Sequence, residues 1–265
     1  MLTGVLGHPV AHSRSPAIQN AAFRATGLDW RYVKLPVAPE LFGETVRALP
    51  ASGYRGANVT IPHKLAALEL SDTASEAARA IGAANTLTFD DEGGIAADNT
   101  DAGGLLDALV QPVGGLRAVV LGAGGAARAA VWALVQEGAG TVTIWNRTRE
   151  RGEAVARELG AASAERPPAC DLLVNATSVG LEPGTSESEA LAALALEGSD
   201  PPAIVVDLVY RADGATTPVA AGGARGGAAV VDGLEILVRQ GARSFSLWTG
   251  LEAPVEAMSA AARGA

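Results

Sequence analysis

The chain has 265 residues, of which 48 % are hydrophobic and 18 % are charged, a composition typical of globular proteins. Its formal net charge is −9 and the sequence contains no Lys/Arg-rich block, which argues against nucleic acid or an anionic membrane as a partner. A single cysteine and three histidines argue against a disulfide framework and against a metal site, and a cytoplasmic location is expected.

The first hundred residues alternate short β-type runs with helical patterns, which predicts an α/β domain. The predicted strands cover residues 2–6, 30–35 and 57–61. The predicted helices cover residues 16–27, 41–49 and 62–70. Residues 85–89 and 95–98 have the pattern of a hairpin. The first residues lack the features of a signal peptide, and no apolar run approaches the ~20 residues that a membrane span needs, so neither is expected.

A second unit begins near residue 116, and its apolar runs are continuous, as in strands of a parallel sheet that is buried on both faces. These runs cover residues 118–121, 141–145, 172–175, 204–207 and 228–231. The sequence pattern predicts no element for residues 186–202 or for the glycine-rich residues 222–227. A new helical period starts at Gly233.

The sequence Gly122-Ala123-Gly124-Gly125-Ala126-Ala127 follows a predicted buried strand and opens an Ala-rich helix. In that context the glycines let the backbone approach a pyrophosphate at the helix N-terminus, which predicts a Rossmann-type dinucleotide site. The alternatives are a glycine turn that only packs strand on helix, or a mononucleotide site.

The residues after the next strand favour NADP over NAD. An NAD site usually carries Asp or Glu about 20 residues after the glycines, to bind the ribose 2′-hydroxyl. This chain has Asn146 there, followed by Arg147, Thr148, Arg149 and Arg151. Arginine can bind a 2′-phosphate that an acidic residue would repel. The arginines could instead form a solvated first helical turn, although cations there oppose the helix dipole.

Several motifs, in order along nearly the whole chain, resemble those of shikimate dehydrogenases. They are GHPVAHSRSP at 7–16, GANVTIPHK at 56–64, GAANT at 82–86, DNTD at 98–101, the glycine motif, NRT at 146–148, NATS at 175–178, DLVY at 207–210 and the helix with Gln240. The resemblance implies a reversible NADPH-dependent reduction of 3-dehydroshikimate to shikimate, in aromatic amino-acid (chorismate) biosynthesis. It also implies a substrate domain over residues 1–101, rejoined by C-terminal helices at about 236–265, and an NADP-binding Rossmann domain over 102–235.

The resemblance assigns Lys64 and Asp101 as the catalytic acid–base pair. Only Lys34 and Lys64 among the 20 basic residues are lysines, and an ammonium, unlike a guanidinium, can release a proton at a ketone. The implied substrate ligands, besides that pair, are Ser13, Ser15, Thr60, Asn85, Tyr210 and Gln240. The implied cofactor ligands are Gly122, Ala123, Gly124, Gly125, Ala126, Asn146, Arg147, Thr148, Arg151, Asn175, Thr177, Ser178, Leu208 and Gly233.

Several alternatives stay open at this point. Ser15, before Pro16, also has the pattern of a helix N-cap, and Arg14 adds a cation beside the proposed carboxylate site. An NAD-using quinate/shikimate dehydrogenase, a methylene-tetrahydrofolate dehydrogenase and a non-catalytic NADP-binding sensor are the rival functions. The sequence does not distinguish a monomer from a homodimer, nor which of Lys64 and Asp101 transfers the proton; Arg147 is the first choice for the 2′-phosphate.

Overall fold

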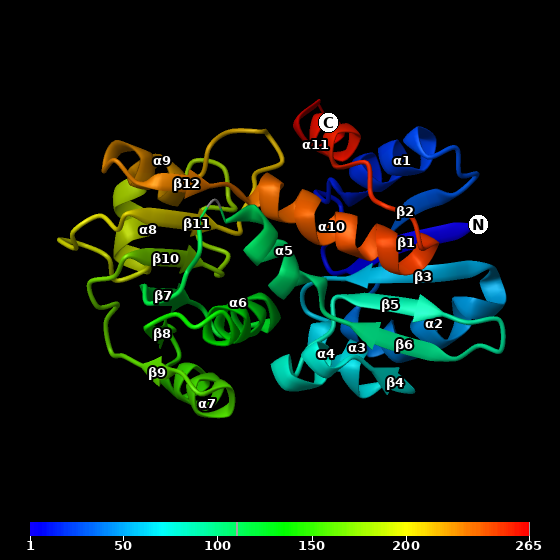
Figure 1. Cartoon of the computed structure of the whole chain (residues 1–265), viewed down its shortest axis with the longest axis horizontal. Coiled ribbons are helices and arrows are strands. Elements are labelled where there is room, and N and C mark those ends of the chain that lie inside the picture. Colours follow the sequence, from blue (N-terminus) through cyan, green and yellow to red (C-terminus); the bar gives the residue numbers. More distant parts are fainter. Residues whose placement is uncertain (110, 265) are drawn as a thin grey trace. The chain divides into compact units, whose positions relative to one another are not determined.

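The computed structural model describes residues 1–109 and 111–264, and it divides into two compact units (Figure 1). Unit 1 comprises Met1–Gly104 and Leu237–Ala265, and unit 2 comprises Leu105–Ile236. Both boundaries fall inside helices, α5 (Thr100–Ala108) and α10 (Gly233–Thr249). Among the described residues, no helix combines the length and the apolar character that crossing a membrane requires.

Unit 1 contains a mixed six-stranded sheet with the strand order β2-β1-β3-β5-β6-β4. The strands are β1 (Leu2–Gly7), β2 (Arg31–Pro36), β3 (Tyr54–Val59), β4 (Thr73–Ala74), β5 (Thr86–Phe89) and β6 (Ile95–Asp98). Strand β1 is parallel to β2 and β3, whereas β5 is antiparallel to β3 and β6. Both faces of the sheet are covered. Successive side chains of β1 point to opposite faces, and Val5 packs in a core with Phe23 and Phe245, whereas Leu6 packs in a second core with Phe42 and Leu87.

The helices of unit 1 lie on these two faces (Figure 1). Those that lie wholly in unit 1 are α1 (Ser15–Ala25), α2 (Phe42–Ala48), α3 (Lys64–Glu69), α4 (Glu76–Ile81) and α11 (Val255–Gly264), with the 3-10 turns η1 (Pro39–Leu41) and η2 (Pro50–Ser52). Helices α1, α10 and α11 enclose one core, to which Phe23, Phe245 and Met258 contribute. The C-terminal part of the chain therefore completes the core of unit 1.

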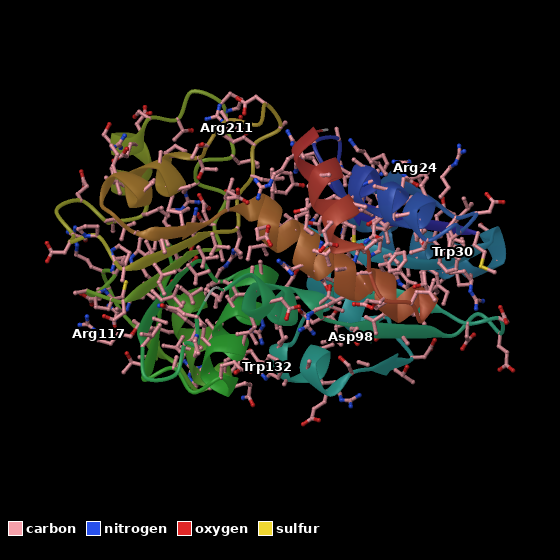
Figure 2. All side chains as sticks on the ribbon, turned by 45° about the horizontal axis from the view of Figure 1, so that its top comes forward. Arg24, Trp30, Asp98, Arg117, Trp132 and Arg211 are labelled. Atoms are coloured by element: carbon pink, nitrogen blue, oxygen red, sulfur yellow. The ribbon has the colours of Figure 1, made fainter. Side chains whose placement is uncertain are left out.

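Unit 2 contains a six-stranded sheet in which every paired strand is parallel, with the order β12-β11-β10-β7-β8-β9. The strands are β7 (Arg117–Leu121), β8 (Thr141–Trp145), β9 (Ala162–Ser163), β10 (Leu172–Asn175), β11 (Ile204–Asp207) and β12 (Ala229–Val231), and the helices are α6 (Gly125–Gln136), α7 (Arg149–Leu159), α8 (Glu187–Ala193) and α9 (Pro218–Arg225). This is the doubly wound dinucleotide-binding order, which reverses between β7 and β10. At the N-terminal ends of these two strands, Arg117 (labelled in Figure 2), the first residue of β7, pairs at 2.8 Å with Asp171, which precedes β10.

The predicted α/β fold class, with a parallel Rossmann-type sheet in the second half, is confirmed. Two segments for which the sequence pattern predicts no element contain helical residues, 187–193 and 222–225. Helix α8 is stabilised by a capping box in which Ser186 and Glu189 bond each other's backbone. Helix α9 forms in spite of its glycines, because Thr217 caps it and because Gly223 lets it pack closely against Val205. A Cβ on Gly223 would lie only 2.8 Å from the Val205 side chain.

Candidate functional site

Lys64 and Asp101 form an ion pair in unit 1. Lys64 is the first residue of α3, and Asp101 lies in the first turn of α5. The Nζ of Lys64 donates a hydrogen bond to Oδ2 of Asp101. The two side chains are 12 % and 17 % exposed, so the pair is shielded from solvent but not sealed. An ammonium and a carboxylate in this setting can exchange a proton with a carbonyl or an alcohol that reaches them.

The turn before α5 fixes the position of Asp101. Asp98, labelled in Figure 2, ends β6, and its carboxylate accepts from the backbone N–H of Asn99 at 2.6 Å. Oδ1 of Asn99 accepts from the backbone N–H of Asp101 at 3.1 Å, and its Nδ2 donates to the carbonyl of Ala83 at 2.9 Å. Asn99 thus satisfies a backbone donor that the start of a helix leaves open. The 98–101 motif positions the carboxylate as well as supplying it.

Asn85 binds the second carboxylate oxygen. Its Nδ2 donates to Oδ1 of Asp101 at 2.7 Å, and its Oδ1 accepts from the backbone N–H of Thr100 at 2.7 Å. A backbone N–H only donates and an ionised carboxylate only accepts, so these contacts decide which end of the amide faces the ion pair. Lys64 and Asn85 therefore fill one oxygen each of the Asp101 carboxylate.

Gln240 reaches the same cluster from α10. It is 8 % exposed, its Nε2 donates to the carbonyl of Leu237 at 2.7 Å, and its Oε1 lies 3.3 Å from Nδ2 of Asn85. Gly104 permits this approach, because a Cβ there would lie 2.6 Å from the backbone nitrogen of Gln240. Sequence reasoning missed Gly104. Two consecutive glycines inside a helix are the signal that could have identified it.

Ser13 and Ser15 lie at the start of α1, and both are buried. The backbone N–H of Ser15 donates to Oγ of Ser13 at 3.3 Å. Arg14 occupies the N-cap position, and α1 has no side-chain cap, so the alternative in which Ser15 caps the helix is wrong. Nη1 of Arg14 donates to the carbonyl of Ala262 in α11 at 2.7 Å, which joins the serine loop to the last helix.

Thr60 and Tyr210, two further predicted substrate ligands, belong to different units. Thr60 follows β3 in unit 1, and its backbone N–H donates to the carbonyl of Leu6 at 2.9 Å. Tyr210 follows β11 in unit 2, where it is partly buried. Their contacts with a substrate stay predictions.

The three histidines lie within the sequence motifs, although no motif assigns them a role. The His63 ring is buried, stacks on Phe42 at a centroid distance of 4.4 Å, and contacts the carbonyl of Val37 at 2.8 Å. His8 and His12 are exposed. A structural role for His63 follows from its packing.

The glycine motif forms the turn between β7 and α6 in unit 2. Gly122 has φ 112°, and a Cβ there would lie 2.9 Å from the carbonyl oxygen of Ala176, so only glycine fits both the backbone and the space. Gly124 is the N-cap of α6 and has no side chain to bond the first helical N–H groups. Ala127 is fully buried. The turn therefore leaves backbone donors at the start of a long helix, where an anion is favoured.

The arginines that follow β8 differ in their partners. Arg149 donates to Glu153 at 2.6 Å and also to Glu165, and the carboxylate of Glu153 raises the pKa of its guanidinium. Arg147 and Arg151 are exposed, and within the described part of the chain neither pairs with a carboxylate. Arg149 is therefore engaged by acidic residues, whereas Arg147 and Arg151 remain available to an anion.

Asn146 shapes the turn from which these arginines project. Its Nδ2 donates to the carbonyl of Thr148 at 2.7 Å, and it lines a small pocket together with Arg149 and Gly152. A Cβ on Gly152 would lie 3.3 Å from the Cβ of Asn146, so the first turn of α7 packs closely against this residue. The predicted contacts of Asn146 and Thr148 with the cofactor stay predictions.

A buried carboxylate organises the loops that follow β10 and β11. Oδ1 of Asp207 accepts from Nδ2 of Asn175 at 2.9 Å, and its Oδ2 accepts from Oγ1 of Thr217. Oδ1 of Asn175 in turn accepts from Oγ1 of Thr177 at 2.7 Å. Burial raises the pKa of Asp207 to about 6, against the lowering effect of its hydrogen bonds. The side chains of Asn175 and Thr177 are both used within the fold, because Oγ1 of Thr177 also accepts from the backbone N–H of Val179 at 3.1 Å. Contacts of Asn175, Thr177 and Ser178 with the cofactor stay predictions.

Gly233, the first residue of α10, lies against the backbone that follows β11. A Cβ on Gly233 would lie 2.5 Å from the carbonyl oxygen of Val209 and 2.9 Å from that of Leu208. The close approach that requires glycine is therefore to the protein's own backbone. Contacts of Gly233 and Leu208 with the cofactor stay predictions.

Three family models match consecutive parts of the chain. They are the shikimate dehydrogenase substrate binding domain over residues 5–87, shikimate / quinate 5-dehydrogenase over 105–179, and the shikimate 5′-dehydrogenase C-terminal domain over 233–263. The first lies within unit 1 and the second within unit 2. Lys64 lies in the segment that matches the substrate binding domain, and Asp101 lies between the first two matched segments.

Relatives cover nearly the whole chain. The shikimate dehydrogenase (NADP(+)) of Methanothermobacter thermautotrophicus is 42 % identical over 97 % of this chain and 94 % of its own. A shikimate 5-dehydrogenase from Thermus thermophilus, solved in complex with NADP(H) and shikimate, is 38 % identical with a TM-score of 0.85 over 100 % and 99 % of the two chains. A ligand-free 5-ketofructose reductase of a Gluconobacter species is 30 % identical with a TM-score of 0.84 over 100 % and 98 %. The chain belongs to the shikimate dehydrogenase family.

Proposed function

We propose that this protein is an NADP-dependent oxidoreductase that catalyses the reversible reduction of 3-dehydroshikimate to shikimate, a cytoplasmic step of aromatic amino-acid biosynthesis. The observation that carries the proposal is the Lys64–Asp101 ion pair, with Asn85 on the second carboxylate oxygen. The name of the 42 % identical relative, shikimate dehydrogenase (NADP(+)), supports the same reaction and cofactor. Monomer and homodimer are both compatible with it.

The residues of unit 2 fit NADP. Gly122 lets the turn pack against the backbone of Ala176, no atom lies within 4 Å of the Cβ position of Gly124, and α6 directs its first N–H groups toward that turn, which suits a pyrophosphate. Arg147 and Arg151 supply exposed cations for a 2′-phosphate. Asn146 stands where an NAD site usually has the Asp or Glu that binds a free 2′-hydroxyl. When bound, NADPH supplies the hydride for the ketone.

Lys64 is the proton donor in this proposal. Asp101 binds Lys64 with one oxygen and Asn85 with the other, so its carboxylate holds the ammonium group in position. An ammonium carries three protons, and Asp101 uses one of them. In the direction of reduction Nζ gives a proton to the ketone oxygen, and in the reverse direction the neutral amine takes it back from the hydroxyl.

The remaining predicted ligands suit a carboxylated polyol. The hydroxyls of Ser13 and Ser15, at the start of α1, are assigned to the substrate carboxylate. Gln240 and Asn85 offer neutral donors and acceptors to ring hydroxyls, with Thr60 and Tyr210 as further hydroxyl partners. Such groups discriminate strongly against analogues that lack a hydroxyl, because a buried polar group would then lose its partner.

Initial rates with purified protein test the proposal, with shikimate and quinate each offered NADP and NAD. We expect strong turnover only with shikimate and NADP. Comparable rates with quinate or NAD would instead place the chain with the broader quinate/shikimate enzymes. A further arm offers 5-ketofructose with NADPH, because a neighbour of that activity is 30 % identical. Bound NADP without turnover of any substrate would contradict an enzymatic role and favour the sensor.

Lys64→Ala then tests the assigned proton donor. We expect kcat to fall by roughly 10²–10⁴, the usual contribution of general acid–base catalysis, while NADP binding measured by fluorescence is unchanged. Lys34→Ala is the control, since Lys34 is the other lysine of the chain and is exposed on β2. A Lys64→Ala variant with wild-type kcat would remove Lys64 from the mechanism.

A further inference from the structure

Ser244 lies at the centre of the polar cluster, although no sequence motif assigns it a role. It is on α10 and fully buried. Its Oγ lies 2.8 Å from Nδ2 of Asn58, 3.0 Å from Oγ1 of Thr86 and 3.1 Å from Oγ1 of Thr100. It also lies 3.1 Å from the carbonyl oxygen of Gln240. One hydroxyl therefore connects β3, β5 and α5 to α10 within unit 1.

The hydrogen bonds of Ser244 can be assigned from what each partner is able to do. The amide nitrogen of Asn58 only donates, so it fills one lone pair of the Ser244 oxygen. The carbonyl of Gln240 only accepts, so it takes the Ser244 hydrogen. The second lone pair of Ser244 is left for the hydroxyl hydrogen of Thr86 or Thr100.

Without Ser244, the remaining acceptors for the two threonine hydrogens belong to the predicted ligands or to the threonines themselves. Oδ1 of Asn85 lies 3.0 Å from Thr86 Oγ1 and 3.1 Å from Thr100 Oγ1, but it already accepts from the backbone N–H of Thr100. The two threonine hydroxyls are 3.2 Å apart. Oε1 of Gln240 is 3.5 Å from Thr100 Oγ1. The Ser244 oxygen is thus the acceptor that draws a hydrogen away from the ligand side chains.

We propose that Ser244 is a positioning residue for substrate binding: it accepts a threonine hydrogen, and so keeps the lone pair of the Gln240 amide oxygen that Asn85 does not use open to a substrate hydroxyl. The inference rests on the proposed function, because it takes Gln240 as a ligand of a hydroxylated ring. Ser244 acts through Thr100 and does not contact the substrate.

Removal of the Ser244 hydroxyl should leave the fold intact, because its partners keep other contacts. Nδ2 of Asn58 lies 3.2 Å from the carbonyl of Asn85 and 3.1 Å from Oγ1 of Thr86. The hydroxyl of Thr86 keeps Oδ1 of Asn85. No buried donor among them is left without an acceptor, and that loss is the costly outcome in such a deletion.

Ser244→Ala is the first test. We expect the KM for shikimate to rise roughly three- to tenfold, the effect of one neutral hydrogen bond, with kcat and the KM for NADP within about twofold of wild type. Ser246→Ala, two residues further along α10, is the matched control and should leave all three constants unchanged. A fall in kcat with an unchanged KM for shikimate would overturn the proposal.

A double-mutant cycle with Thr100→Val tests the route through Thr100. Valine has the shape of threonine but carries no hydroxyl hydrogen to compete for Gln240. Ser244→Ala should then raise the KM for shikimate no further in the Thr100→Val background. The same fold increase in both backgrounds would show that Ser244 does not act through Thr100, and would overturn the proposal.

The same four proteins separate this inference from the proposed function. If the wild type does not turn over shikimate, the proposed function fails, and the cycle is read from urea unfolding instead. A Ser244–Thr100 coupling in the free energy of unfolding then supports the hydrogen bond on which the inference depends, and a coupling of zero overturns it.

Discussion

At the scale of single residues, Asp207 makes the stability of the protein depend on pH. It is a buried carboxylate whose hydrogen-bond donors are neutral groups, Asn175 and Thr217 among them. Its pKa is about 6 in the folded protein, against about 4 for an unfolded chain. Folding therefore favours the protonated form. The contribution of Asp207 to stability is complete below about pH 4 and is lost as the pH rises through 6, a difference of roughly 3 kcal/mol.

Asp207→Asn tests this dependence. The carboxamide can still accept from Asn175, and its NH₂ group can donate to Thr217, whose hydroxyl hydrogen then loses its acceptor at every pH. We therefore expect the variant to gain stability relative to wild type as the pH rises to 8. The gain should shrink toward pH 4, where the wild-type carboxyl is protonated. Urea unfolding at several pH values measures it, and a difference that does not vary with pH would contradict the assignment.

Asp213→Asn is the matched control. Asp213 is exposed, and the hydrogen bonds from Arg211 (labelled in Figure 2) lower its pKa instead of raising it. Its contribution to stability is present at neutral pH and is lost as the pH falls. The variant should therefore show no gain in stability at pH 8.

The sequence could nominate candidate site residues but not the bonds between them. Resemblance named Asn85 and Asp101, and the structure places them in contact, as it does Lys64 and Asp101. The orientation of the Asn85 amide depends on the backbone N–H of Thr100, and no local pattern indicates that contact. Ser244 was missed because a single serine on a helix has no distinguishing signal, and its importance comes from three elements that are distant in sequence.

At the scale of elements, glycines decide how closely α5 packs against α10 in unit 1. Gly104 faces the backbone of Gln240, whereas a Cβ on Gly103 would lie 2.4 Å from the guanidinium carbon of Arg243, the end of a flexible, exposed side chain. The backbone cannot move aside as that side chain can. The two neighbouring glycines therefore differ in what they contribute.

Gly104→Ala should separate the two helices, and Gly103→Ala should not. We expect the first variant to lose roughly 1–3 kcal/mol in the free energy of unfolding, as overpacked cores do, and to show a higher KM for shikimate because Gln240 is displaced. The second should lose less than the first, because the end of the Arg243 side chain shifts more easily than backbone and because alanine is the better helix former. Equal effects of the two substitutions, measured by urea unfolding, would contradict this account.

The first turn of α7 and the residues before it separate two arginines by their partners. Arg147→Ala should weaken NADP binding by at least about tenfold, the value of a charged hydrogen bond, and should affect NAD much less. Arg149→Ala should change both affinities little, because Arg149 already pairs with Glu153 and Glu165. Titration of each variant with both cofactors measures the difference. Equal losses of NADP and NAD in Arg147→Ala would remove its assignment to the 2′-phosphate.

Strands were easier to predict than helices. The apolar runs at 118–121 and 172–175 are continuous because β7 and β10 are buried on both faces, so composition alone identifies them. Helix α9 has glycines where a helix former is expected, and its stability comes from the Thr217 cap and from packing of Gly223 against Val205. Those contacts are tertiary, and a window of sequence does not contain them.

At the scale of the whole molecule, each unit has its own sheet and its own group of predicted ligands. Lys64, Asp101 and Gln240 belong to unit 1, and the glycine turn and the Arg147 segment belong to unit 2. The C-terminal helices return to unit 1, where Met258 packs in the core with Phe23 and Phe245. We infer that shikimate and NADP are each recognised mainly by one unit.

Hydrogen exchange of the amides tests that division. NADP alone should slow exchange at the start of α6 and in the loop after β10, and shikimate alone should slow it at the starts of α3 and α5. Ligand binding protects amides that it removes from local opening, so the pattern reports where each molecule binds. Protection by NADP confined to unit 1 would contradict the assignment of the units.

Because lysine is scarce in this chain, the ion pair can be followed by chemical modification of amines. The chain has two ε-amines, that of Lys34 exposed on β2 and that of Lys64 only 12 % exposed and bonded to Asp101. An acylating reagent reaches exposed amines first, so Lys34, whose Nζ donates to the carbonyl of Ala11, reacts before the shielded Lys64. Apart from the terminal amine, the last acyl group to appear in the mass spectrum is that of Lys64, and its rate of appearance reports how well the ion pair is shielded. A molecule with the usual abundance of lysines would bury that signal among many others.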